Sequence, residues 1–250
     1  MAPKAPPKKS VWNKPPPPRG ARTRALQTVE RLRGLYSAVT ELSNENPFQL
    51  LIATILSAQT TDRSVNLVTP ELFRRWPSAN DLAAADPAEV QALIKPTGFF
   101  RAKTVRIIAA SRKLVELFNG EVPQNLDDLV KVPGIGRKTA NVILGAGFGV
   151  PGFAVDTHVI RLTNRIGMVR TSDPVKIEFQ VCDMVPKEEW TGLSLRLILH
   201  GRRICDARRP LCGECVLNDF CPSSLTRPGR RLRNGRPIGE APNSDIKVAR

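Results

Sequence analysis

The sequence predicts an all-α protein, and three observations support this fold class. Between residues 25 and 222, apolar residues recur at steps of three and four, which is the spacing of one face of an α-helix. Proline and small polar residues precede several of these segments and glycine follows others, as at the two ends of helices. Alternating apolar runs bounded by hairpin turns, which would indicate strands, do not occur in the sequence.

In the first half of the chain, helix signals fall at four places. The segment 26–42 has an apolar stripe at Leu26, Val29, Leu32, Leu35 and Val39. Segment 47–58 opens with proline and is apolar on nearly every face, which is typical of a helix buried in a bundle. Asp86 and Pro87 open a short helix to about Ile94. An amphipathic helix over 101–119 is expected to end at Gly120.

The second half of the chain continues the pattern. Further helices are expected at about 125–131, 137–147, 156–166, 174–184 and 189–204. A glycine-rich break near residue 150 is the natural domain boundary. Gly145, Gly147 and Gly149 match the spacing of a nucleotide-binding loop, but such a loop needs a strand before it and a helix opening on it. Here a helix ends at the glycines, and the nucleotide interpretation is set aside.

The net charge of +15 is concentrated at the two ends of the chain. Residues 1–24 hold seven Lys or Arg and no acid, while residues 223–250 hold seven against two acids. Tails rich in Pro, Gly and Ser, over 1–21 and 223–250, are expected to be disordered. They could serve solubility alone, but a polyanion-binding arm is favoured. No charge-free apolar run approaches 18 residues, so no membrane span is expected.

Four cysteines near the end of the chain are the most specific metal-binding signal. Cys205, Cys212, Cys215 and Cys221 follow the spacing C-x6-C-x2-C-x5-C. Four thiolates within seventeen residues match the ligand set of a [4Fe–4S] cluster. Structural zinc usually shows two C-x2-C pairs, disulfides need an oxidising compartment, and unrelated buried thiols are a weaker alternative. The fifth cysteine, Cys182, lies among apolar residues and is interpreted as part of the core.

A second segment indicates phosphate binding. Pro133, Gly134, Ile135 and Gly136 join a short helix to one that starts with Arg137. Two glycines permit a tight turn with accessible N–H groups, and the following helix adds the positive end of its dipole. The alternative is an ordinary helical hairpin, in which a single glycine would be common.

These motifs together resemble the iron–sulfur members of the helix–hairpin–helix DNA glycosylase superfamily. The quoted segments are Val132–Asn141 (VPGIGRKTAN), Val155–Val159 (VDTHV), Leu56–Asp62 (LSAQTTD), Ile198–Arg202 (ILHGR) and the four-cysteine spacing. The resemblance runs from about residue 25 to 222. It implies two helical domains, a bundle over 44–150 and an iron–sulfur domain formed by 22–43 with 151–222. A cleft between them would hold Lys138 on one wall and Asp156 on the other.

Lys138 and Asp156 carry the chemistry that the resemblance implies. An amine that attacks a sugar carbon must be neutral, and the first turn of a helix disfavours a cation at Lys138. Taken singly, Lys138 could be a solvated or phosphate-neutralising charge, and Asp156 could be only a helix N-cap. In the family's order and spacing, they are interpreted as a nucleophile that forms a Schiff base and a carboxylate that assists it. His158 and His200 are interpreted as structural.

The resemblance also implies that several further residues contact DNA. Gln59 would fill the gap left by a flipped nucleotide, although a Gln at a helix end could equally bond to backbone. Phe99 stands where the family often has a leucine wedge, and it could also belong to the core. Gly134, Gly136 and Arg137 would bind phosphate at the hairpin. Arg208 and Arg209, between two cluster ligands, would present cations to phosphate.

The implied activity is a bifunctional DNA glycosylase and abasic-site lyase acting on double-stranded DNA with damaged bases, with oxidised pyrimidines as the usual substrates of the family. A monomer in a reducing cytoplasm is expected. The alternatives are a mismatch-specific glycosylase for adenine or thymine, a non-catalytic DNA-binding protein, and a redox sensor built around the cluster. Adenine-specific relatives usually lack a lysine at position 138 and carry a further C-terminal domain.

Overall fold

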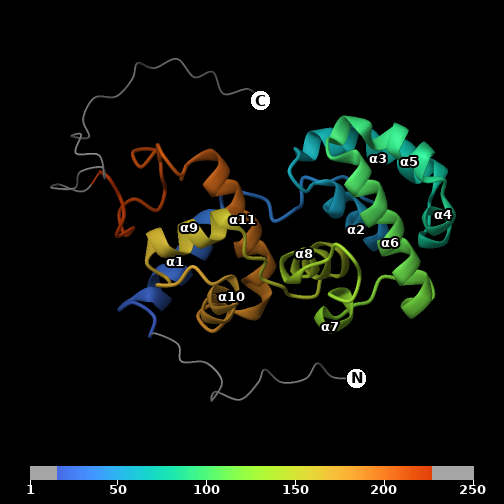
Figure 1. Cartoon of the computed structure of the whole chain (residues 1–250). Helices are drawn as coiled ribbons and strands as arrows, with labels where there is room; N and C mark the ends of the chain where they lie inside the picture. The colour runs from blue at the N-terminus through green and yellow to red at the C-terminus, as the bar shows by residue number, and fades with distance from the viewer. Residues whose placement is uncertain (1–15, 227–250) are drawn as a thin grey trace.

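The computed structural model describes residues 16–226, and this part of the chain contains helices and no strands (Figure 1). The α-helices are α1 (Ala21–Arg33), α2 (Pro47–Leu56), α3 (Asp62–Arg75), α4 (Ala79–Ala84), α5 (Pro87–Ile94), α6 (Phe100–Phe118), α7 (Leu126–Leu129), α8 (Arg137–Phe148), α9 (Thr157–Ile166), α10 (Pro174–Cys182) and α11 (Trp190–Arg203). Two 3-10 helices, η2 (Lys95–Thr97) and η3 (Lys187–Glu189), complete the order. The all-α prediction is confirmed. Most of the two predicted tails lies outside the described residues, and Ala21 already belongs to α1.

Local sequence explains where most of the helices begin. An N-cap side chain accepts a hydrogen bond from the first turn in seven helices, at Asn46, Thr61, Ser78, Asp86, Asn125, Asp156 and Asp173. Proline occupies the first turn of α2, α5 and α10, where its missing N–H costs nothing. These signals lie within a few residues of each boundary, which is why the expected starts near 47, 87, 157 and 174 agree with the structure.

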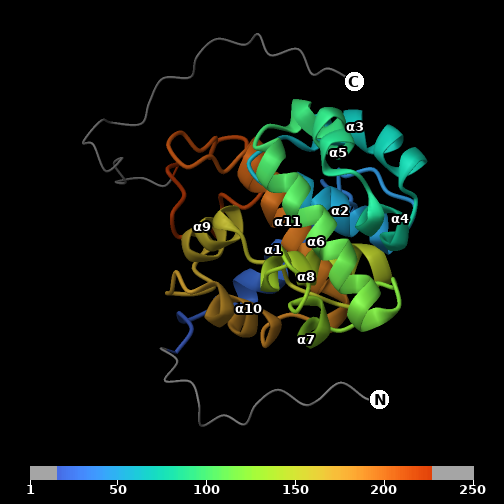
Figure 2. The same ribbon diagram turned by 45° about the vertical axis from the view of Figure 1, so that its right-hand side comes forward.

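Two hydrophobic cores organise the helices. The first core runs from Leu42 to Leu144 and unites α2 through α8, with α6 packed against α2, α4 and α5. The second unites α1 with α9, α10 and α11 and extends to Leu217. Figures 1 and 2 both show α1, from the start of the chain, lying among these three late helices. The N-terminal helix and the cysteine segment therefore share one core.

The prediction of a single helix over 26–42 is wrong. The helix α1 ends at Arg33, and Leu35 and Val39 are 51 % and 67 % exposed instead of forming a buried stripe. Tyr36 leaves the helical direction because its side chain bonds to His200 and its carbonyl accepts from Arg196. Gly34, the C-cap of α1, weakens the helix at this point, and these tertiary contacts hold the following residues away from the helical direction. The helices α3 and α4 were not expected individually, and α3 continues through an internal Pro70.

The glycines near residue 150 have packing roles. A Cβ added at Gly145 would lie 2.5 Å from the side chain of Thr191, so only glycine lets α8 approach α11 this closely. Gly149 takes a left-handed conformation and ends α8. With a helix in place of a strand before these glycines, the structure agrees with the rejection of a nucleotide loop. None of the helices within residues 16–226 has the length and apolar character needed to cross a membrane.

Candidate active site and iron–sulfur centre

Lys138 lies in the first turn of α8, directly after the hairpin that joins α7 to α8. Its side chain is 52 % exposed, and its Nζ lies 3.7 Å from Oδ2 of Asp156. The pair bridges the two cores, since α8 packs in the first core and Asp156 opens α9 in the second. The amine is thus accessible to a bound molecule and also adjacent to a carboxylate.

The two carboxylate oxygens of Asp156 have different partners. Oδ1 accepts hydrogen bonds from the backbone N–H groups of His158 and Val159 at 2.8 and 2.9 Å, which makes Asp156 the N-cap of α9. Oδ2 faces Lys138, and the side chain is only 12 % exposed. The cap therefore orients the second oxygen toward the amine. The helix-cap and catalytic interpretations are compatible because each uses its own oxygen.

The hairpin before α8 presents backbone N–H groups to open space. Gly134 has a φ of 85°, a left-handed conformation that favours glycine, and it lies beside Ile55 at the end of α2. Gly136 is the N-cap of α8 and supplies no side-chain acceptor. A Cβ at Gly136 would meet no atom of the described chain within 4 Å. The start of α8 is therefore open to an approaching anion such as a phosphate.

The side chain of Arg137 pairs with a residue of another helix. Its guanidinium forms two hydrogen bonds of 2.7 Å with the carboxylate of Glu178 on α10, and it lies over the ring of Phe179 at 5.3 Å. Such a two-point pair is a strong, directional contact. Glu178 raises the pKa of Arg137 by hydrogen bonding. Arg137 thus ties α8 to α10, and the hairpin offers its backbone more readily than this guanidinium.

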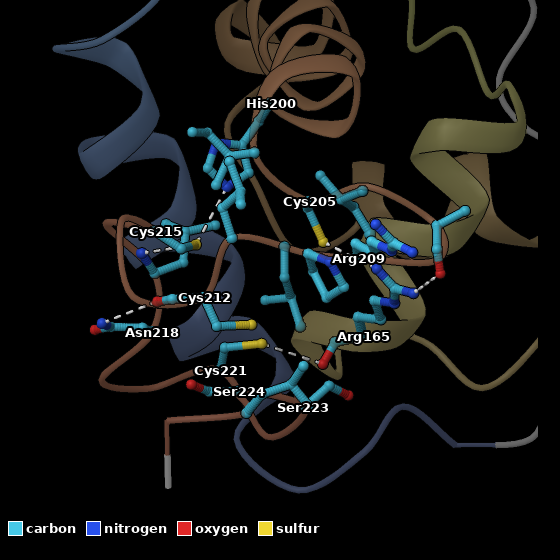
Figure 3. Close-up of a pocket in the computed structure, with 18 of the residues that line it drawn as sticks. Arg165, His200, Cys205, Arg209, Cys212, Cys215, Asn218, Cys221, Ser223 and Ser224 are labelled. Carbon is cyan, nitrogen blue, oxygen red and sulfur yellow. Dashed lines mark hydrogen bonds between the residues drawn. The ribbon is translucent and has the colours of Figure 1, made fainter. Parts of the chain in front are cut away.

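The four cysteines line one cavity of about 1230 Å³. Figure 3 shows their sulfur atoms pointing into a common space, with His200, Arg165 and Arg209 around it. Among the described residues, no three His, Cys, Asp or Glu side chains lie close enough together to chelate a single metal ion. Thiols distributed around a shared space fit a multi-iron cluster better than one zinc ion.

The chemistry of these thiols also fits an iron–sulfur cluster. Burial, together with the neighbouring Cys205, Cys221 and Cys212, raises the pKa of the Cys215 thiol to about 11, although a hydrogen bond from the Leu217 N–H opposes this shift. Four adjacent thiolates would repel each other, so a cationic centre is needed to hold them deprotonated. Cys182, in contrast, lies against the second core on α10, and burial raises its pKa as expected for an inert thiol.

The loop between the first two cysteines, residues 206–211 (the cluster loop), is held by hydrogen bonds that sequence reasoning did not identify. Arg165 on α9 donates to the carbonyls of Asp206 and Ala207 at 2.6 and 2.7 Å and to Sγ of Cys205 at 3.4 Å. Asp206 in turn accepts from the backbone N–H groups of Arg208 and Arg209 at 2.8 and 2.9 Å. Both arginine side chains are exposed on this ordered loop, where they can meet an anionic partner.

His200 orders the other side of the cavity. Its Nε2 lies 3.3 Å from Sγ of Cys215, and its Nδ1 lies 3.1 Å from the hydroxyl of Tyr36. Burial lowers the pKa of His200 to about 4, which keeps the ring neutral. The structural interpretation of His200 agrees with this geometry. The position of His200 in an apolar helix was visible in the sequence, but its partners were not: Tyr36 comes from the other end of the described chain and Cys215 from the segment after α11.

Gln59 and Phe99 share an unusual backbone conformation. Among the described non-glycine residues with positive φ are Gln59 at 55° and Phe99 at 47°; the third, Asn119, ends α6. Such left-handed residues cost about 1–3 kcal/mol each and concentrate at functional sites. Gln59 is exposed in the turn after α2, and Phe99 is 68 % exposed before α6. An exposed aromatic in a strained turn argues against the core alternative for Phe99.

Comparison with known proteins identifies the relatives of this chain. Residues 52–187 match the model of the HhH-GPD superfamily base excision DNA repair protein, and residues 205–221 match the iron–sulfur binding domain of endonuclease III. Endonuclease III of Synechocystis sp. is 50 % identical over 203 residues, which cover 80 % of this chain and 93 % of that protein.

Solved structures show the same relationship. A trapped endonuclease III–DNA covalent intermediate has a TM-score of 0.76 and 39 % identity, covering 81 % of this chain and 96 % of the other. A thermostable thymine-DNA glycosylase has a TM-score of 0.73 at 20 % identity, covering 82 % and 97 %, and so shares the fold alone.

The helical fold, with its hairpin and paired Lys138 and Asp156, defines a base excision DNA repair protein of the HhH-GPD superfamily. Within that superfamily, the chain belongs to the endonuclease III family. It is a DNA glycosylase and abasic-site lyase, and its cofactor is a [4Fe–4S] cluster.

Proposed function

We propose that Lys138 is the nucleophile of this enzyme and that Asp156 is its assisting carboxylate. The observation that carries the proposal is the 3.7 Å separation of Lys138 Nζ and Asp156 Oδ2, with the other oxygen of Asp156 held in the cap of α9. A half-exposed amine can reach a sugar in bound DNA, while a mostly buried carboxylate keeps its orientation. Nucleophile and base within a few ångströms are the expected arrangement for covalent catalysis.

The reaction then follows in ordered steps. The damaged nucleotide rotates out of the duplex stack. Asp156 accepts a proton from the Lys138 ammonium and passes it on to the departing base, and the carboxylate restored in this way stabilises positive charge that develops on the sugar. The neutral amine forms a bond to C1′ as the glycosidic bond breaks, and the departing base takes its electron pair and a proton. The nitrogen then loses a proton, its lone pair forms the C1′=N bond as the C1′–O4′ bond breaks, and O4′ takes up that proton. The opened sugar is thereby linked to Lys138 as an iminium, the protonated imine.

Strand cleavage uses the same imine. The iminium draws electrons from C2′, whose proton passes to a base, and the bond from C3′ to its phosphate oxygen breaks. Water then hydrolyses the imine and returns Lys138. Cys205, Cys212, Cys215 and Cys221 would hold the [4Fe–4S] cluster, whose contribution when bound is to order the segment that carries Arg208 and Arg209.

DNA contacts are proposed at three places. The open N–H groups at Gly134 and Gly136 would bind one phosphate. Arg208 and Arg209 would neutralise phosphates beside the cluster. Gln59 and Phe99 would enter the space around the displaced nucleotide, since both are exposed and held in strained turns. The side chain of Arg137 is a weaker candidate because Glu178 engages it.

Borohydride trapping tests the nucleophile directly. Reduction of the imine should give a covalent protein–DNA adduct with wild-type protein on abasic DNA. Lys138→Gln should abolish the adduct while retaining the fold, because the side chain is half-exposed and its ion pair contributes about 1 kcal/mol or less. Lys176→Gln, in the first turn of α10, is the matched control and should form the adduct normally. An adduct of undiminished yield with Lys138→Gln would refute the assignment.

For the substrate, we propose oxidised pyrimidines. The identity to endonuclease III relatives and the presence of Lys138 support this over a mismatch-specific glycosylase. The test compares duplexes bearing thymine glycol, dihydrouracil, an abasic site, a mismatched thymine, and adenine opposite 8-oxoguanine. Cleavage only at one of the mismatches would favour the alternative glycosylase, and binding without any cleavage would favour a non-catalytic protein.

We further propose that each hydrophobic core is one domain, with limits near 44–150 for the first and 22–43 with 151–222 for the second. A monomer in the cytoplasm, associated with the nucleoid, would suit a repair enzyme whose cysteines are kept reduced as cluster ligands. Sedimentation of the cluster-loaded protein and cell fractionation test these two points.

A further inference from the structure

Lys103 is the largest fully buried side chain of the described chain. It lies on α6, is only 2 % exposed, and belongs to a residue type that is almost never buried without a partner. Its Nζ donates a hydrogen bond of 2.7 Å to the carbonyl oxygen of Thr97. None of the proposed catalytic steps uses this amine, and its burial keeps it away from phosphate. Another reason must explain a lysine at this position.

The contacts of Lys103 surround the turn that carries Phe99. Its side chain binds the carbonyl of Thr97, and its backbone N–H donates to the carbonyl of Phe99 at 3.1 Å. These two carbonyls stand on either side of Gly98, which has a φ of 67°. The bond to Phe99 is the first backbone bond of α6, so the side-chain bond to Thr97 is the contact that depends on lysine, and it fixes the start of the left-handed pair Gly98–Phe99.

The charge of Lys103 suits this position. The helix α5 ends at Ile94 and the short η2 that follows it ends at Thr97, where carbonyl groups point out of the helix with partial negative charge. An ammonium group at this end satisfies a carbonyl that would otherwise be buried without a donor. Thr97 reinforces the same turn, since its Oγ1 donates to the carbonyl of Ile94 at 2.8 Å.

The turn separates two adjacent phenylalanines. Phe100 packs against the first core, whereas Phe99 is 68 % exposed. Phe99 also stands at the N-cap of α6 without any side-chain cap, in a left-handed conformation that a phenylalanine adopts only when its surroundings impose it. Lys103 and the anchored Phe100 supply those surroundings at the junction of α5 and α6 (Figure 2).

We propose that Lys103 is a positioning residue that holds the turn 97–99 so that Phe99 stands ready to insert into DNA. The inference rests on the proposed role of Phe99 as a wedge and adds the residue that pre-organises it. A wedge fixed before binding loses less conformational freedom when the complex forms. Lys103 acts through Phe99 and does not touch DNA.

A double-mutant cycle tests this coupling in the full-length, cluster-loaded protein. The variants are Phe99→Ala, Lys103→Met and the double substitution, and the measured quantities are dissociation constants for a duplex with a stable abasic-site analogue and for the undamaged duplex. Because base–aromatic stacking is the interaction lost, Phe99→Ala should weaken binding to the abasic duplex about tenfold. Lys103→Met should weaken it in the same direction, and the double variant should bind like Phe99→Ala alone.

Two further readouts separate positioning from other roles. The slope of affinity against salt concentration should be unchanged in Lys103→Met, whereas loss of a phosphate contact would reduce its magnitude by about 1. A 2-aminopurine opposite the lesion should report weaker stacking in Lys103→Met. Ser111→Ala removes a buried hydroxyl two turns further along α6 that has no hydrogen-bond partner, and this control should leave both readouts unchanged.

The outcomes are distinguishable. If Phe99→Ala alone leaves binding to the abasic duplex unchanged, the wedge role itself fails. If Phe99→Ala weakens binding but Lys103→Met has no effect, or has its full effect in the Phe99→Ala background, only the inference about Lys103 is overturned. Should Lys103→Met fail to fold, Lys103→Gln provides the same cycle. Its amide remains a donor in the buried space but is too short to hold Thr97 in place, and the same lack of additivity is expected.

Discussion

Asp156 caps α9 with one carboxylate oxygen, and the proposed mechanism assigns the charge on the other to catalysis. The substitution Asp156→Asn should separate these two roles. Asparagine caps helices as well as aspartate does, so its side-chain oxygen can keep the bonds to His158 and Val159. The substitution removes only the negative charge that faces Lys138. The two carboxylate oxygens can therefore be tested one at a time.

The expected magnitudes follow from the geometry. In the free enzyme, Lys138 is 52 % exposed, so solvent screening limits the 3.7 Å ion pair to about 1 kcal/mol or less. Asp156→Asn should thus lower the melting temperature by no more than about 2–4 °C. Asp156→Ala also loses the cap, which costs about 1 kcal/mol more. In the mechanism proposed above, the same carboxylate would face developing positive charge away from water, where such a group is worth about 10²–10³ in rate.

The assay is single-turnover base release from a thymine glycol duplex, with calorimetric melting of the same protein samples. We expect Asp156→Asn to be slow but stable, and Asp156→Ala to be slow and less stable. A normal rate of base release in Asp156→Asn would refute the catalytic role of the charge. Equal destabilisation by the two substitutions would refute the assignment of Oδ1 to the cap.

Three other predictions concern packing, pH and the cluster. Gly145→Ala should destabilise the protein by about 1–3 kcal/mol in chemical denaturation, because its Cβ would clash with Thr191. The control Gly147→Ala, whose Cβ would lie 3.3 Å from a leucine side chain, should leave the stability close to that of the wild type. Burial lowers the pKa of Lys103, so the unfolded chain binds this proton more tightly. The free energy of unfolding of the wild type should therefore rise relative to that of Lys103→Met as the pH increases from the lowered pKa of the folded state toward the ordinary pKa of 10.5. A difference in unfolding free energy that stays constant over this pH range would contradict the prediction. Arg165→Met should release iron to a chelator about tenfold faster or more, since hydrogen bonds from a charged donor to the cluster loop are worth about 1.5–3 kcal/mol each; an unchanged rate would show that the cluster loop is held without Arg165.

Much of the fold could be predicted because the signals are local. Asn46 and Pro47 start α2 through a hydrogen bond and a fixed φ within one turn, and the same holds for Asp173 and Pro174 at α10. The end of α1 could not be predicted in this way. Gly34, the C-cap, is a local stop signal, but the apolar spacing continues through Leu35 and Val39 and favours a longer helix; the structure ends α1 at Arg33, and Tyr36 reaches His200 in another part of the chain.

In the candidate site, too, the local features could be predicted from the sequence and the contacts between distant segments could not. The hairpin glycines, the spacing of Lys138 and Asp156, and the four cysteines are short patterns in the sequence, and each implies its chemistry by residue type. The pairing of Arg137 with Glu178 and the support of the cluster loop by Arg165 were not visible. The first contact joins α8 to α10 and the second joins α9 to the cluster loop, and in each case the two segments are about forty residues apart in the sequence.

The sequence by itself determined which residues could carry amine chemistry, phosphate binding and iron–sulfur ligation, together with most helix starts, because these properties depend on a residue and its nearest neighbours. Only the tertiary structure decided that Asp156 directs one oxygen to α9 and the other to Lys138, and that Lys103 is buried beneath the turn of Phe99. The physical reason is that burial and hydrogen-bond partners are set by which helices pack together, and that packing is a property of the whole chain.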